Sequence, residues 1–289
     1  MEVLINLTVN GLATGMLIFL LAAGLTLIFG LMDVLNFAHG GLFVWGAFTG
    51  IWAYGQTGSF VMGIVAAITI GLALGWLMER WIVRPVYGNH MQQILITLGA
   101  MLVLSEMIKV VWGPNQISAK APAWLEGSWN LDGVILIKYR LFIILVGLLV
   151  LAGSQFLLKR TKWGLIVRAG VANPEMVQAL GIHIRLVFMC VFMFGSALAA
   201  LGGVLMGPYS GVIYAEMGME YAILAFIVVI IGGMGSITGS AVAAIFVGLA
   251  NGWISYYFPD FALAVNMIFM LLVLLLKPEG IFGVKEVKG

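Results

Sequence analysis

The chain has 289 residues, of which 63% are hydrophobic and 9% charged, with a formal net charge of +2 and a mean hydropathy of +1.12. A soluble domain carries roughly a quarter charged residues, so this composition excludes the ordinary soluble classes. The charges fall in loops and form no basic stripe, so we expect no nucleic-acid partner. Cys190 is the single cysteine, which excludes a disulfide within the chain and a cysteine metal framework. We expect Cys190 to be a small buried apolar residue.

Two long stretches without Asp, Glu, Lys or Arg establish membrane helices. They run from Asp33 to Glu79 and from Glu220 to Asp260, and each exceeds the roughly 20 residues that cross a bilayer and is long enough for two crossings with a turn between. The N-terminus lacks a basic region and a cleavage site, so we expect the first apolar run to remain a membrane segment. We predict an all-α polytopic transmembrane bundle, one domain over 1–289, with about 8–10 membrane segments, some of them discontinuous or re-entrant. The expected crossings are 6–30, 40–56, 60–81, 92–112, 140–158, 186–206, 219–233, 238–256 and 261–277.

Two glycine-rich joints interrupt this apolar sequence, at Asp33–Gly41 and at Gly232–Gly239. Irregular backbone at membrane depth must be hydrogen-bonded within the protein or to water, so both joints are predicted to be discontinuous or re-entrant segments. In the first joint, broken helices would present free N–H groups to a carboxylate beside Asn36 and His39. The alternative is that Asn36 and His39 only satisfy freed backbone groups. In the second joint, the Ser236 hydroxyl is available to the backbone or to a solute.

Lysine and arginine gather in three segments: 79–92, 159–185 and the C-terminal tail with Lys277, Lys285 and Lys288. Such segments face the cytoplasm. The turns near 55–60, 207–220 and 255–260 hold no Lys or Arg and are expected outside. The N-terminus is therefore predicted to be periplasmic and the C-terminus cytoplasmic.

The loop over 159–185 contains a short helix with explicit end signals. Asn173 suits the N-cap and Pro174 the first helical position. Glu175 would face the positive end of the helix dipole, and Gly181 suits the left-handed C-terminal position. A capped helix in a cytoplasmic loop offers a rigid contact to a partner protein. The alternative is a connector lying on the membrane surface.

Other patterns indicate packing or exclude chemistry. Glu106 and Lys109 are spaced to pair on one helix face. No Gly-Lys-Ser or Gly-Lys-Thr occurs, so ATP would be bound by another chain, and no Gly-x-Ser-x-Gly elbow supports a serine hydrolase. Glycines at small-xxx-small spacing predict close helix packing within the chain rather than dimerisation. The pairs are Gly11/Gly15, Gly46/Gly50, Gly71/Gly75, Gly203/Gly207 and Gly248/Gly252. The two glycine-broken joints also hint at an internal repeat.

Several motifs resemble those of the branched-chain amino acid ABC importer permeases, in particular the LivH-like subunits. The most specific is Gly24-Leu25-Thr26-Leu27-Ile28-Phe29-Gly30 followed by Val34-Leu35-Asn36-Phe37-Ala38-His39-Gly40. Further matches are Arg84-Pro85, Ile96-Thr97-Leu98-Gly99, Arg168-Ala169 through Ile182, Gly232-Gly233-Met234-Gly235-Ser236 and Lys277–Gly283. Gly41 and Met176 depart from the family pattern, since relatives often carry an acidic residue and an alanine there.

The resemblance implies a permease subunit of the bacterial inner membrane, without enzyme activity or a bound cofactor. It implies a periplasmic substrate-binding protein, a LivM-like second permease and two cytoplasmic ATPase subunits that bind ATP and Mg. Branched-chain amino acids are the family default, and relatives carry urea, short amides, neutral amino acids or aromatic acids. The implied path residues are Asn36, His39, Thr97, Gly233 and Ser236. The implied ATPase-coupling residues are Arg168, Glu175, Ala179 and Gly181.

Other functions would require sequence features of their own. A stand-alone secondary transporter needs a carboxylate buried at mid-membrane, and only Asp33 is a candidate, near the cytoplasmic end. A passive channel or a membrane enzyme would need a charged pore ring or a nucleophile with a base, and the sequence shows neither.

Overall fold

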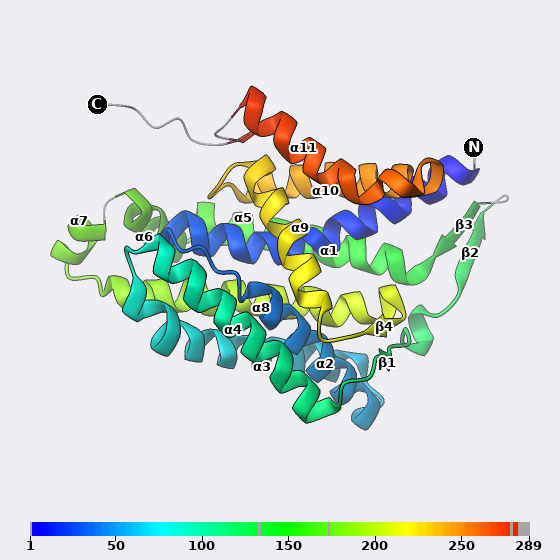
Figure 1. Ribbon diagram of the computed structural model, residues 1–289, viewed down its shortest axis with the longest axis horizontal. Helices are drawn as coiled ribbons and strands as arrows, with labels where there is room; N and C mark the ends of the chain where they lie inside the picture. The colour runs from blue at the N-terminus through cyan, green and yellow to red at the C-terminus, as the bar shows by residue number, and fades with distance from the viewer. Residues whose placement is uncertain (1, 132–133, 173, 278–279, 283–289) are drawn as a thin grey trace.

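The computed structural model describes residues 2–131, 134–172, 174–277 and 280–282, and over these it is an all-α bundle (Figure 1). The N-terminus and a hairpin of β2 (Ser128–Leu131) and β3 (Val134–Ile137) lie at one end of the long axis, here the hairpin end. Helices α6 (Lys162–Ala172) and α7 (Pro174–Ala179) lie at the opposite end, here the α7 end.

Helix α1 (Glu2–Met32) forms the centre of the bundle. It is apolar along its length, and 89% of its most hydrophobic window is buried by the helices around it. Packing, rather than amphipathic patterning, therefore decides its position, as expected for a helix that is hydrophobic all round. The other long helices are α2 (His39–Thr57), α3 (Phe60–Leu77), α4 (His90–Trp112), α5 (Lys138–Arg160), α8 (Ile184–Ser210), α9 (Met217–Gly232), α10 (Ile237–Tyr257) and α11 (Ala262–Leu276).

Each of the nine predicted crossings corresponds to one of these helices. Among the described residues, six helices are long and apolar enough to cross a membrane. The shorter ones are α2, α9 and α11, with 19, 16 and 15 residues. The prediction of an all-α polytopic bundle with discontinuous segments is confirmed.

Two segments expected as loops have structure of their own. Helix α3 continues through a π-helical turn (Met78–Val83) and a 3₁₀ turn (Arg84–Val86), so the third apolar helix extends to Val86. Between α4 and α5, β1 (Ile117–Ser118) pairs with β4 (Val212–Ile213). A 3₁₀ turn (Ala123–Leu125) and the hairpin follow, with Ser128 opposite Ile137 and Leu131 opposite Val134.

Glycines set the distances between the central helices. In α1, a Cβ at Gly11 would lie 2.7 Å from the Leu249 Cα, and one at Gly15 would lie 2.7 Å from the Ala244 oxygen. All ten glycines of the five predicted pairs face another helix of this chain. The prediction of packing within the chain is confirmed, because such close approach is available only where side chains are absent.

The chain contains an inverted repeat. Helices α1, α2 and α3 correspond to α8, α9 and α10, and each unit has six residues between its first two helices, 33–38 and 211–216. Both connecting stretches open with a positive φ, 51° at Asp33 and 79° at Gly211. Both close with the same turn, in which His39 N donates to Asn36 O and Met217 N donates to Tyr214 O, each at 3.4 Å.

Each position in the first unit corresponds to the position 178 residues later in the second unit. The contacts between the two units follow this correspondence. Gly40 faces Gly218, and Gly218 approaches Gly40 in return, with the Cβ position 2.7 Å from the Gly40 oxygen. Phe43 stacks on Tyr221 with ring centroids 5.3 Å apart. Each of these pairs maps onto itself under this correspondence, so both lie on a pseudo-two-fold axis, as in the inverted repeats of transporters.

The second predicted joint is corrected by this repeat. Gly232–Gly239 is no discontinuous segment: a four-residue turn, 233–236, joins α9 to α10, with positive φ at Gly233 and Gly235. The true counterpart of Asp33–Gly41 is 211–216, which the sequence indicated as an ordinary turn. Its single glycine and the apolar strand residues Val212 and Ile213 did not distinguish it from a loop, although it ends in Glu216.

The glycine contacts predict a contrast within one helix. Gly46→Ala in α2 places a methyl group against the Ala200 backbone, whereas Gly55→Ala meets nothing within 4 Å. We expect Gly46→Ala to cost about 1–3 kcal/mol through overpacking. Gly55→Ala should be neutral or stabilising by up to about 1 kcal/mol. Thermal unfolding of the two purified variants in detergent measures the difference, and equal melting temperatures would contradict the packing.

Candidate functional site

The joint between α1 and α2 returns the chain to the interior of the bundle. After Met32 the backbone turns at Asp33 and runs back beside α1 until α2 begins at His39. There the His39 Nε2 donates to the Leu21 oxygen at 3.0 Å. Leu21 lies eleven residues before the end of α1, which corresponds to about 16 Å along the helix. Helix α2 therefore begins deep inside the bundle, as the sequence predicted.

A second helix begins at the same place. The first turns of α2 and α9 meet at Gly40 and Gly218. Neither helix has a hydrogen bond from an N-cap side chain. Each helix N-terminus carries a partial positive charge and orphan N–H groups. The two N-termini together form what is here called the N-terminal junction, and at α9 its positive dipole end is flanked by the carboxylates of Glu216 and Glu220.

Thr97 of α4 holds the joint in position. Its Oγ1 accepts from Phe37 N at 3.2 Å and lies 3.3 Å from Leu35 O and 2.6 Å from Gln93 O, to which its hydroxyl proton is available. Thr97 is fully buried. The hydroxyl is therefore a bridge between α4 and the irregular backbone, which needs partners where water is excluded.

The side chain of Asn36 is fully buried, and neither its Oδ1 nor its Nδ2 has a hydrogen-bond partner. The Nδ1 of His39 is likewise buried and unpartnered, although Nε2 bonds to Leu21. Buried polar groups nearly always have partners, so such groups call for an explanation. His39 satisfies a backbone group, in line with the alternative reading of the sequence, but Asn36 does not. Its amide offers one acceptor and two donor positions to another group.

Gly233 and Ser236 lie elsewhere. The turn that contains them packs with Gly235 on Gly30, six residues or about 9 Å along α1 from Gly24. Ser236 Oγ accepts from Gly239 N at 3.1 Å as the N-cap of α10. The structure brings Asn36, His39 and Thr97 together, and it gives Ser236 a structural role away from them.

Glu216 lies beside the N-terminal junction, and the sequence did not single it out. Lys109 pairs with Glu106 at 2.8 Å, as predicted, and also with Glu216 at 2.8 Å. Glu216 immediately precedes α9, so this second pair connects α4 to the N-terminal junction. Its partner lies more than a hundred residues away, and spacing along the chain could not indicate the pair.

A buried carboxylate anchors the opposite end of α4. Glu79 is fully buried in the π-helical turn and forms a bidentate pair with Arg84, at 3.1 and 2.9 Å. Tyr87 donates to Glu79 at 2.7 Å, and burial together with this bond raises the pKa of Tyr87. These bonds fix the connection between α3 and α4, and with it the position of Thr97.

The 159–185 segment is mostly helical. α5 continues to Arg160, and α6, which the sequence did not indicate, begins after Thr161. Arg168 donates to the Leu158 oxygen and so folds α6 back onto α5.

Helix α7 is the predicted short helix. Glu175 lies in its first turn, Ala179 is its last residue, and Gly181 adopts φ +82° beyond its C-terminus. Ile182 N closes this end on Val177 O. The expected N-cap, Asn173, lies outside the described residues.

A multi-pass bundle with an inverted repeat and two helices that begin in its interior defines a membrane transport protein. Residues 7–276 match the family described as "Branched-chain amino acid transport system / permease component". The chain belongs to this family, and it is the permease subunit of an ABC importer rather than an enzyme, since ATP is hydrolysed in separate subunits.

Individual relatives agree with this membership. The chain is 30% identical to the high-affinity branched-chain amino acid permease LivH of Escherichia coli K12, over 96% of this chain and 95% of LivH. It is 29% identical to BraD of Pseudomonas aeruginosa, over 97% and 96%. Among solved structures, PsaBC from Streptococcus pneumoniae in complex with Fab has a similar fold, with a TM-score of 0.50 and 14% identity over 94% and 92% of the two chains.

Thr97→Val tests the bridge to the joint. Valine keeps the shape but leaves Phe37 N without an acceptor, which costs about 1–2 kcal/mol, a factor of roughly 5–30 in local opening. We expect amide exchange in residues 33–38 to accelerate by that factor, measured by hydrogen–deuterium exchange and mass spectrometry. Thr97→Ser keeps the hydroxyl and should exchange as the wild type does. Unchanged exchange in Thr97→Val would exclude the bridge.

Proposed function

We propose that this permease carries branched-chain or related small amino acids by alternating access, and that the N-terminal junction receives the solute's carboxylate. The observation that carries the proposal is the meeting of two uncapped helix N-termini at Gly40 and Gly218, beside the unpartnered amide of Asn36. Oriented N–H groups and the helix dipoles favour a carboxylate. The Asn36 amide can add one hydrogen bond to the carboxylate or to the ammonium group.

The solute class follows from the relatives, whose names specify branched-chain amino acids. Urea, amides, neutral amino acids and aromatic acids remain alternatives within the same family. A stand-alone secondary transporter is a weaker candidate, because Asp33 is 71% exposed and lies 3.3 Å from His90. An ion-coupling carboxylate would instead be buried among other groups.

The coupling to ATP is proposed to occur at the α7 end. Helix α7 packs through Val177, which is buried, and presents Met176, which is 63% exposed, next to Leu180 just beyond its end, which is 75% exposed. An exposed apolar pair on a short, C-capped helix fits a groove on a partner protein. Two cytoplasmic ATPases that bind ATP and Mg would dock there, so the α7 end is placed in the cytoplasm and the N-terminus in the periplasm. A LivM-like second permease and a periplasmic binding protein complete the proposed importer of the inner membrane.

Asn36→Leu tests the solute site. The Asn36 amide has no partner within the chain, so an apolar residue of similar size should leave folding and assembly unchanged. We expect ATP-dependent uptake in proteoliposomes with all partners to fall at least about tenfold, the value of one lost hydrogen bond to a charged group. Asn10→Leu, at a half-buried amide near the start of α1, is the matched control and should keep full uptake. Full uptake by Asn36→Leu would contradict the proposed site.

Gly181→Pro tests the coupling helix. Proline cannot adopt φ +82°, so the end of α7 is lost. Glu175→Lys reverses the charge in the first turn. We expect both variants to assemble but to lose solute-stimulated ATP hydrolysis. Gly181→Asn, which tolerates the left-handed conformation, should retain it. Normal stimulation in Gly181→Pro and Glu175→Lys would refute α7 as the coupling element.

A further inference from the structure

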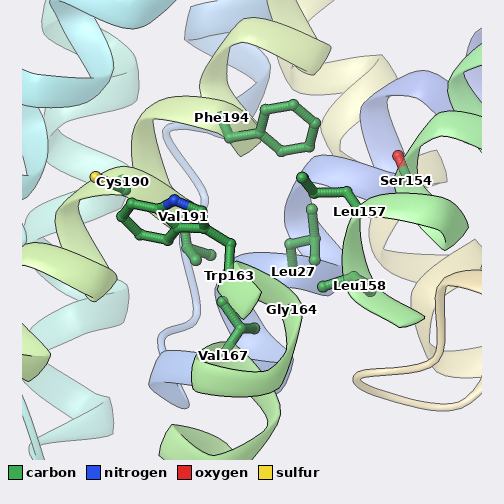
Figure 2. A pocket seen from close by; sticks show the side chains of 10 residues that line it. All are labelled: Leu27, Ser154, Leu157, Leu158, Trp163, Gly164, Val167, Cys190, Val191 and Phe194. Atoms are coloured by element: carbon green, nitrogen blue, oxygen red, sulfur yellow. The ribbon is translucent and has the colours of Figure 1, made fainter. Parts of the chain in front are cut away.

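A pocket of about 280 Å³ opens between α1, α5, α6 and α8, close to the α7 end (Figure 2). Its walls are almost wholly aliphatic and aromatic, with Phe194 and Trp163 on two sides and Leu157 and Leu158 on a third. The volume is slightly below the roughly 300–1,000 Å³ of typical small-molecule sites. It therefore suits a section of a long apolar chain better than a compact solute.

The pocket exists because α6 folds back sharply on α5. Thr161 ends α5, and its hydroxyl then accepts from Gly164 N at 3.1 Å at the start of α6. A side chain at Gly164 would collide with the Leu158 oxygen, so glycine permits the close return. Cys190 faces this space and is exposed, contrary to the buried position expected from the sequence.

The chain next to the lining residues of α5 and α6 is strongly basic, and its three basic residues are here called the basic rim. Lys159, Arg160 and Lys162 are all exposed and stand within two residues of lining side chains. The sequence holds no Asp or Glu between Asp132 and Glu175. Among the described residues, no carboxylate forms a salt bridge with any of the three. The rim thus carries three positive charges without protein counter-ions.

Two polar features sit at the border of this apolar space. Ser154 lines the pocket, and its buried Oγ has no hydrogen-bond partner. Trp163 is half exposed at the level of the basic rim, the position that tryptophan takes at a membrane interface. An occupant is therefore expected to be apolar along its length and to end in an anion.

We propose that this pocket binds one acyl chain of an anionic phospholipid, whose phosphate is held by Lys159, Arg160 and Lys162. Basic pockets between membrane helices commonly bind such headgroups, and lysine and arginine extend along apolar surface to reach them. The lipid fills the space between α6 and α8, and it supports the segment that leads to α7.

Cys190 provides a probe inside the pocket. The detergent-purified transporter, with all its subunits, is delipidated and treated with N-ethylmaleimide, and labelling of the Cys190 peptide is followed by mass spectrometry. Dioleoyl phosphatidylglycerol and dioleoyl phosphatidylcholine are added in parallel, since they share acyl chains and differ in charge. We expect phosphatidylglycerol to slow labelling at least about tenfold more than phosphatidylcholine does, because each basic residue near an anionic headgroup contributes roughly a fivefold preference.

The triple variant Lys159→Gln, Arg160→Gln, Lys162→Gln should abolish this difference between the two lipids. The double variant Lys120→Gln, Lys138→Gln removes charges toward the hairpin end and should keep it. Equal protection by both lipids in the wild type would overturn the anionic site. Labelling that is indifferent to lipid, and that rises only when partner subunits are removed, would show a protein contact instead and would also overturn it.

Discussion

The backbone inside this bundle has to find its hydrogen bonds within the protein, and the whole arrangement depends on how two interrupted helices meet that requirement. At α2, the turn from Asn36 O to His39 N and the Thr97 hydroxyl satisfy part of the irregular chain. At α9, Met217 N likewise donates to Tyr214 O, and glycine at Gly40 and Gly218 lets the two helix starts touch. The positive ends of two helix dipoles meet there, with Glu216 and Glu220 at the start of α9 as the nearest acidic residues along the chain. The same close approach that solves the packing problem therefore also concentrates helix N-termini at one place in the bundle.

Much of the fold could be predicted from apolar length alone, since each of the nine expected crossings corresponds to a helix. The first joint was also predictable, because Asn36 and His39 are polar residues within a charge-free run. The second interrupted segment, 211–216, was not predictable, because glycine has two separate structural uses that a sequence does not distinguish. At Gly233 and Gly235 glycine supplies positive φ for a tight turn, whereas Gly40 and Gly218 supply close approach. The break at 211–216 needed only one glycine and otherwise reads as an ordinary turn.

Polar residues inside apolar sequence were easier to predict than the partners of carboxylates. Thr97 and Asn36 were both indicated, and the structure joins them through the backbone of Leu35 and Phe37. The carboxylate of Glu216 escaped notice because its partner Lys109 belongs to another helix. The pair of Glu79 with Arg84 was not predicted, because it depends on a π-helical turn that the sequence does not indicate. This turn brings Arg84, five residues later, into bidentate contact with Glu79. Tertiary placement, rather than residue type, decides both cases.

The inverted repeat constrains how the chain can move. If its two halves were separate rigid bodies, contacts between them would be loose away from the axis. The opposite is observed, because α1 of the first half interlocks with α10 of the second through Gly11 and Gly248, and α3 interlocks with α8 through Gly71 and Ala200. Such glycine contacts tolerate little sliding, since close-packed interfaces resist small displacements. The least buried windows belong to α5, at 17%, and to α3 and α4, at 28% each, and of the latter two α3 is held by its glycine contacts to α8. Motion that opens a path to the N-terminal junction is therefore expected at the outer face of α4, against a neighbouring subunit, while the two halves move as one body.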